Sequence, residues 1–132
     1  MGAPGGVKLV VQSDDFGMCH AVNTGTVAAF LDGIVTQTTM MAPCPWFDEA
    51  AALAHEHDIP VGVHLTLTCE WDHLRWRPMT SGGSLVGDDG TFLRTVEDAQ
   101  AALDRDEAVA ELLTFAVRAV TGWAAVGSGG VG

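Results

Sequence analysis

Short apolar runs alternate with stretches of helical periodicity along the first half of the chain. The runs at residues 7–12, 34–41 and 61–68 predict three strands, the first of them buried, because apolar and β-branched residues dominate each run. Residues 20–32 and 47–57 lie between these runs and predict two helices. Strands that alternate with helices are typical of a parallel α/β fold, in which ligands bind at the C-terminal ends of the strands.

The second half of the chain has a different pattern. Residues 71–83 are irregular, and residues 84–94 predict a small hairpin that turns at Asp89 and Gly90. Residues 104–120 predict an amphipathic helix, since apolar residues recur there at helical spacing. The apolar side of this helix consists of Val109, Leu112, Leu113, Ala116 and Val120.

Length and composition indicate a single domain. The 132 residues suffice for one hydrophobic core. We place the domain at residues 7–121 and expect the Gly-rich residues 122–132 to form a disordered tail. The odd number of widely spaced cysteines argues against a disulfide framework.

The charge of the chain limits its partners and its location. Seventeen acidic and six basic residues give a net charge of -11, which repels the phosphates of nucleic acids and anionic membranes. A neutral or cationic ligand fits this charge better. The sequence contains neither a signal peptide nor an apolar run of roughly 20 residues, so we expect a cytoplasmic protein without a membrane span.

Two carboxylates and one imidazole are the candidate chemical groups. Asp14 and Asp15 follow the first apolar run, and His64 lies in the third, on the face opposite its valines and leucines. Adjacent carboxylates repel each other unless a cation or hydrogen bonds compensate. Mixed oxygen and nitrogen ligation suits zinc or another first-row divalent ion, whereas magnesium prefers oxygen ligands. The alternatives are an acidic pair that caps a loop and a packed histidine.

Two tryptophans in the irregular segment are weaker candidates. Trp71 and Trp76 could stack on a sugar ring, or they could cover the edge of the sheet. The pattern of residues leaves both interpretations open.

Several short motifs, in the right order, resemble the YdjC-like family of carbohydrate deacetylases, which act on chitooligosaccharides and related sugars. Residues 13–17 (SDDFG) resemble the opening (A/S)DDFG motif of the family, and residues 62–68 (GVHLTLT) resemble its GxHLxLT motif. Residues 32–36 and the hairpin at 84–93 also match the family pattern. The resemblance covers roughly residues 7–115.

The resemblance implies a fold, a reaction and a set of roles. The implied fold is a distorted (β/α) barrel related to other polysaccharide deacetylases. The implied reaction removes an N-acetyl group from a small amino-sugar oligosaccharide with a divalent metal ion, zinc or magnesium. Asp14 would be the general base, and Asp15 and His64 would be metal ligands.

The sequence departs from the family pattern after the helix predicted at residues 104–120. The family carries a further metal-binding histidine in the segment that follows, whereas no histidine follows His73 here. A full barrel needs about 200 residues or more. We therefore expect a partial, truncated barrel, whose open sheet edge could pair with a second copy.

Two other functions are compatible with parts of the pattern. A non-catalytic fragment would bind sugar or metal weakly, since only two metal ligands can be named. A phospho-receiver domain is a remote alternative. It would need an aspartate at the end of the third strand and a lysine at the end of the fifth, but residues 67–69 are Leu-Thr-Cys and the only lysine is Lys8.

Overall fold

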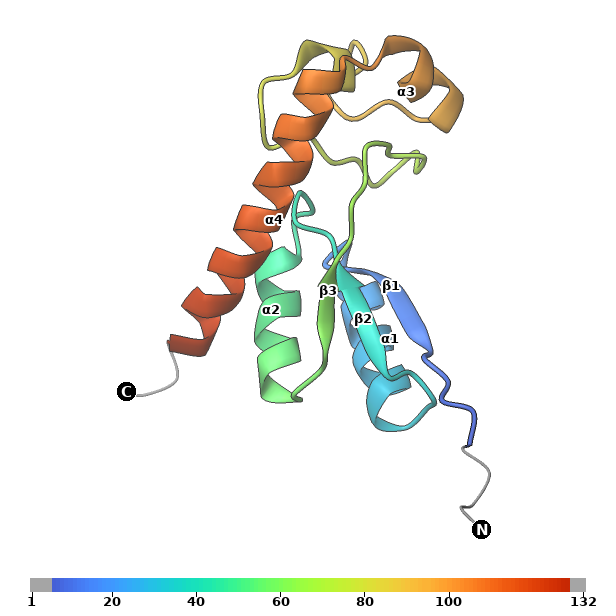
Figure 1. Ribbon diagram of the computed structural model, residues 1–132, viewed down its shortest axis with the longest axis vertical. Coiled ribbons are helices and arrows are strands. Elements are labelled where there is room, and N and C mark those ends of the chain that lie inside the picture. Colours follow the sequence, from blue (N-terminus) through green and yellow to red (C-terminus); the bar gives the residue numbers. More distant parts are fainter. Residues whose placement is uncertain (1–5, 129–132) are drawn as a thin grey trace.

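The computed structural model describes residues 6–128 and contains a small parallel sheet covered by helices (Figure 1). Strands and helices alternate through the first half, and the second half is helical apart from a compact loop region. The elements in chain order are β1 (Gln12–Phe16), α1 (His20–Leu31), β2 (Gln37–Met40), α2 (Phe47–Glu56), β3 (Val61–Val63), the 3₁₀ turn η1 (Gly83–Leu85), α3 (Val96–Ala102) and α4 (Arg105–Ser128).

The sheet has the order β1-β2-β3, and both strand pairs are parallel. β1 and β2 each lead into a helix that returns the chain to the start of the next strand, which is why successive strands run in the same direction. The α/β class expected from the sequence is therefore confirmed, with a parallel sheet of three strands within residues 6–128. The shared direction brings the C-terminal ends of all three strands to one edge.

The core lies between the sheet and the helices α1, α2 and α4. Phe16 and Met40 reach it from the strands, Phe47 from α2 and Phe115 from α4, and all four are at most 2% exposed. Alanines at positions 50, 51 and 54 allow α2 to approach its neighbours closely. Full burial of a phenylalanine or methionine side chain contributes about 1.5–3 kcal/mol, so these side chains account for much of the cohesion of the domain.

The first strand lies further along the chain than the apolar run predicts. Residues 7–12 were expected to be a buried strand, but β1 begins at Gln12, and Val7, Leu9 and Val10 are 97%, 75% and 64% exposed. The prediction was wrong because an apolar run is buried only where another element covers it. Within residues 6–128 nothing covers this one.

The loop region confirms the hairpin and adds a helix. Val86 and Phe92 form an antiparallel bridge, and the amide of Gly90 donates to the carbonyl of Gly87, so the chain turns at the expected place. Gly90 has a φ of 70°, a conformation that favours glycine. Helix α3 follows, although the sequence analysis did not predict it. Its start is marked by Thr95, whose hydroxyl accepts a hydrogen bond from the amide of Asp98.

Helix α4 is longer than predicted and is rotated relative to its predicted orientation. It continues to Ser128, so residues 122–128, which we expected to be disordered, are helical, and residues 129–132 lie outside the described part of the chain. Its buried side carries Ala108, Glu111 and Phe115. The predicted apolar side is largely exposed, with Leu113 62% exposed.

Candidate functional site

The two adjacent aspartates lie in a bulge at the end of β1. The register with β2 shifts between Ser13 and Phe16, and Asp15 has a φ of 65°. A left-handed residue inside a strand breaks the alternation of side chains between the two faces of the sheet. The bulge therefore allows both carboxylates to lie near the same neighbour, Asp15 directly and Asp14 through one intervening hydroxyl.

That neighbour is His64, the first residue after β3. Its amide donates a hydrogen bond of 2.9 Å to the carbonyl of Met40, which continues the pairing with β2 beyond Val63. The predicted position within the third strand is thus one residue beyond the observed strand. The imidazole contacts Thr39 of β2 and Asp15 of β1, so all three strands contribute to the site.

A chain of hydrogen bonds links Asp14 to one side of the imidazole. Gln12 Nε2 and Thr39 Oγ1 both donate to Asp14 Oδ1, at 2.6 and 2.8 Å. The same Thr39 oxygen lies 3.0 Å from His64 Nδ1. The hydroxyl of Thr39 has one proton and gives it to the carboxylate, which cannot donate. His64 must therefore donate its Nδ1–H to Thr39 Oγ1, and this fixes the tautomer.

The electrostatic consequence for Asp14 is a lowered pKa. The hydrogen bond from Thr39 is the largest cause and that from Gln12 the next, because both stabilise the ionised carboxylate. Asp14 is therefore a carboxylate at neutral pH.

The other side of the imidazole faces Asp15. With the proton on Nδ1, His64 Nε2 carries a lone pair, and it lies 3.6 Å from Asp15 Oδ1. Two hydrogen-bond acceptors at this separation repel each other unless a cation or an additional proton lies between them. The amide of Asp15 also points at His64 Nδ1, at 3.5 Å, which is a longer and weaker contact than the 3.0 Å contact of the same nitrogen with Thr39.

The spacing of this pair suits two neighbouring ligands of one ion. Zinc bonds to carboxylate oxygen and imidazole nitrogen are about 2.0–2.2 Å long, and a tetrahedral angle between two such bonds separates the donor atoms by about 3.4 Å. The observed 3.6 Å is close to this value. The donors Asp15 and His64 therefore fit a divalent ion, and the hydrogen bond at Nδ1 orients the imidazole as in many metal sites.

A third ligand is not found in the part of the chain that the structure describes. Among residues 6–128, no group of three or more His, Cys, Asp or Glu residues could hold a metal ion. The sequence-predicted ligands Asp15 and His64 are thus brought together, and the site they form is open on the remaining sides. Their side chains are 42% and 24% exposed, so an ion from solution can reach them.

The pair opens into a polar pocket of about 230 Å³. Asp15 and His64 line it together with Glu70, Trp71 and Trp76. Trp71 is half-exposed, whereas Trp76 is 4% exposed and forms part of the wall. Both tryptophans therefore border the pocket, and of the two Trp71 presents more surface to a ligand.

Sequence reasoning missed Thr39, Gln12 and Glu70 in this site. The register of the sheet could have found Thr39, because Ser13 pairs with Thr38, and Thr39 itself pairs with Gly62. The residue after Thr38 must then lie beside Asp14. No comparable signal marks Glu70, which reaches the pocket through an irregular loop.

Comparison with known proteins assigns the family. The family model described as YdjC-like protein matches residues 8–114. The chain belongs to the YdjC-like family. It is 44% identical over 87 residues to a carbohydrate deacetylase of Vibrio vulnificus, an alignment that covers 65% of this chain and 32% of that protein. It is also 39% identical over 108 residues to a chitooligosaccharide deacetylase of Yersinia enterocolitica, covering 79% and 40%.

The fold of this YdjC-like chain matches a solved structure. The crystal structure of a candidate cellobiose-phosphate cleavage protein from Enterococcus faecalis superposes with a TM-score of 0.73 and 28% sequence identity, covering 89% of this chain and 44% of the other. The chain spans between about a third and two-fifths of the length of these curated relatives. Across residues 6–128 no helix is long and apolar enough to cross a membrane.

Proposed function

We propose that this YdjC-like chain carries part of the site of a metal-dependent deacetylase that hydrolyses N-acetyl groups on small amino-sugar oligosaccharides. The carboxylate of Asp15 and Nε2 of His64, 3.6 Å apart, are the observation that carries the proposal. The printed functions of the relatives, carbohydrate deacetylase and chitooligosaccharide deacetylase, support the choice of reaction and substrate class.

The hydrogen bonds of the site support the roles that we propose. Asp15 and His64 hold the divalent ion, zinc or magnesium. When bound, such an ion polarises the amide carbonyl and makes a neighbouring water more acidic. Thr39 holds the imidazole in the tautomer that leaves Nε2 free for this purpose. Zinc suits the imidazole better than magnesium does, since magnesium prefers oxygen ligands.

Asp14 is the proposed general base. Its carboxylate takes the proton of the water that attacks the amide carbonyl. The hydrogen bonds from Thr39 and Gln12 keep Asp14 ionised, although a lowered pKa also makes it a weaker base. General-base catalysis contributes about 10²–10⁴-fold, and loss of the carboxylate should reduce the rate by a factor in this range.

The residues that line the pocket favour a neutral sugar as the ligand. Its lining carries Glu70 and Asp15 but no lysine or arginine, so it disfavours an anionic ligand and suits a neutral sugar. The exposed ring of Trp71 provides an apolar surface on which the face of a pyranose can stack. A cytoplasmic location remains our expectation from the sequence.

A non-catalytic fragment is the second candidate function. It is favoured by one observation: residues 6–128 supply two metal-ligating side chains where catalytic zinc usually has three. Such a fragment would bind an ion weakly without turning over substrate.

One experiment on the 132-residue chain tests both candidates. Zinc is titrated into the wild type and into Asp15→Asn, His64→Gln and, as a matched control, His73→Gln, and heat is measured by calorimetry. We expect weak binding to the wild type and the control, and no binding to the other two variants. Equal binding by all four proteins would exclude Asp15 and His64 as ligands.

A second assay measures catalysis. Acetate released from diacetylchitobiose in the presence of zinc is measured for the wild type and for Asp14→Asn. A loss of about 100-fold or more in the variant supports the general base. Zinc binding without any acetate from the wild type would establish the non-catalytic function instead.

A further inference from the structure

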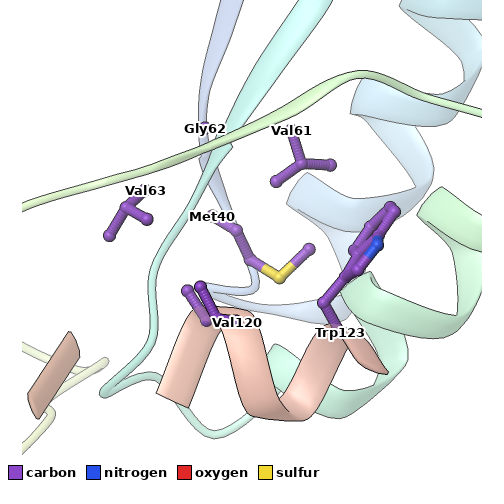
Figure 2. A pocket seen from close by; sticks show the side chains of 7 residues that line it. Met40, Val61, Gly62, Val63, Val120 and Trp123 are labelled. Atoms are coloured by element: carbon purple, nitrogen blue, oxygen red, sulfur yellow. The ribbon is translucent and has the colours of Figure 1, made fainter. Parts of the chain in front are cut away.

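His64 and Asp15 are supported by different kinds of neighbour. The strand that leads into His64 packs over an apolar hollow of about 340 Å³ between the sheet and α4. None of the residues that line this hollow has a carboxylate, an amide or a hydroxyl in its side chain. Figure 2 shows the larger side chains around it, from the sheet and from α4: Met40, Val61, Val63, Val120 and Trp123. Polar support for the chain at Asp15 therefore has to come from other elements.

Asp15 begins a tight turn between β1 and α1, which we call the β1–α1 turn (residues 15–18). The carbonyls of residues 15, 16 and 17 accept hydrogen bonds of 3.0, 2.8 and 3.1 Å from main-chain amides. Gly17 has a φ of 99°, and a Cβ on it would lie 3.3 Å from the Cα of Phe47, so the turn lies tightly against the start of α2. Asp15, with a φ of 65°, is left-handed as well. Such a conformation is costly for a residue other than glycine unless neighbouring contacts enforce it.

One contact of the β1–α1 turn comes from a side chain. Asn23, in the first turn of α1, is 0% exposed, and its Oδ1 accepts a hydrogen bond of 2.7 Å from the amide of Gly17. Its Nδ2 donates to the carbonyl of Trp46, at 3.2 Å, and to Glu49 Oε2, at 2.7 Å. The side chain of Asn23 thus joins the turn to α2 and to the residue before it.

The partners of Asn23 also determine which way its amide points. The amide of Gly17 can only donate, and the carboxylate of Glu49 can only accept. The pKa of Glu49 is lowered, chiefly by the hydrogen bond from Asn23, so Glu49 is ionised at neutral pH. Both N–H groups and the oxygen of the Asn23 amide therefore have a partner, as a buried amide requires.

We propose that Asn23 is a positioning residue of the candidate metal site: by holding the amide of Gly17, it keeps Asp15 in the conformation that directs its carboxylate at His64. The inference rests on the proposed function in one respect, the role of Asp15 as a metal ligand. The hydrogen bonds of Asn23 go to neither proposed ligand, so it acts on Asp15 through the main chain.

Loss of the Asn23 side chain leaves the amide of Gly17 buried without its acceptor. The amide can regain a partner only if the conformation of the β1–α1 turn changes, because an unpaired buried donor is unfavourable. Such a change would move the carboxylate of Asp15 relative to Nε2 of His64, which now lies 3.6 Å away.

The first test needs no metal. The three-bond coupling between the amide and α protons of Asp15 reports its φ, and it is measured by NMR on the full 132-residue chain. We expect this coupling to change in Asn23→Ala and to keep its wild-type value in Glu111→Ala, the matched control. Glu111 is also a fully buried acceptor of main-chain amides, but those amides belong to residues 79 and 80. An unchanged coupling in a folded Asn23→Ala protein would overturn the proposal.

The second test measures zinc binding, by following the NMR signals of the His64 ring as zinc is added. We expect zinc to bind Asn23→Ala about 10-fold more weakly than the wild type, as is common when a residue that orients a metal ligand is lost. Glu111→Ala should bind zinc like the wild type. Equal affinities of Asn23→Ala and the wild type would overturn the proposal. A wild type that binds no zinc would contradict the deacetylase function instead, and the coupling of Asp15 would still decide the role of Asn23.

A double variant keeps the proposal testable if Asn23→Ala does not fold. In Asn23→Asp combined with Glu49→Gln, one aspartate oxygen can accept from Gly17 and the other from the glutamine amide. The hydrogen bond between positions 23 and 49 is then retained with its direction reversed, and only the longer contact to the carbonyl of Trp46 is lost.

We expect the double variant to have the Asp15 coupling and the zinc affinity of the wild type. Asn23→Asp alone brings two carboxylates together, where Asn23 Nδ2 and Glu49 Oε2 are now 2.7 Å apart, and it should behave like Asn23→Ala. A double variant that does not recover the wild-type values would show that the acceptor at position 23 does not position Asp15.

Discussion

Thr39 is the residue on which the geometry of the candidate site depends. Its hydroxyl donates to Asp14 and accepts from His64, so one side chain sets both the charge of the carboxylate and the tautomer of the imidazole. The sequence singled out Asp14, Asp15 and His64 as candidate residues by their types and by their positions near strand ends. It did not predict their connection, because hydrogen bonds across strands depend on register and on the bulge at Asp15.

Replacement of Thr39 by valine should raise the pKa of Asp14 towards its ordinary value of 3.8, since the largest cause of the lowered pKa is lost while the bond from Gln12 remains. The pKa is measured by following the carboxyl carbon by NMR as the pH is lowered. Thr24→Val is the matched control, because the Thr24 hydroxyl donates only to backbone carbonyls of α1. An unchanged pKa of Asp14 in Thr39→Val would contradict the proposed hydrogen-bond chain.

Among the elements, α4 shows most clearly what the pattern of apolar residues cannot determine. The helix itself was predicted, but the side predicted to be buried is largely exposed, and a glutamate lies at the centre of the buried side. Glu111 is fully buried and accepts hydrogen bonds from the amides of Met79 and Thr80 and from the Thr80 hydroxyl. A buried carboxylate with three donors is satisfied, and no periodicity analysis would place it in a core.

Glu111→Ala should lower the free energy of unfolding by about 2–4 kcal/mol, because three donors in the loop at residues 79–80 lose their acceptor. Urea unfolding at neutral pH measures this change. Glu97→Ala, at an exposed position of α3, is the control and should alter stability by less than about 1 kcal/mol. Equal effects of the two substitutions would show that the contacts of Glu111 contribute nothing.

The strands show a related limit of the sequence. The apolar run at residues 7–12 was assigned to a buried strand, yet pairing in the structure begins where Thr36 donates to the carbonyl of Val11. Hydrophobicity indicates that burial of a segment is favourable, but it does not indicate which element packs against that segment. The same limit explains the exposed face of α4.

At the scale of the whole molecule, the fold class and the parallel order of the strands could be predicted, because they follow from local alternation of strands and helices. Which apolar surfaces of the described residues stay exposed could not be predicted, because that depends on how the elements pack in three dimensions.

The left-handed backbone of Asp15 has a consequence for which amino acids this position can accept. Glycine, asparagine and aspartate adopt such a φ at low cost, whereas β-branched residues are strained there. Of those three, aspartate alone carries a negative charge, so the shape of the main chain and the proposed role of Asp15 as a metal ligand favour the same amino acid independently. A glutamate would keep the negative charge but is less favourable at this φ, whereas an asparagine would tolerate this φ but carry no charge.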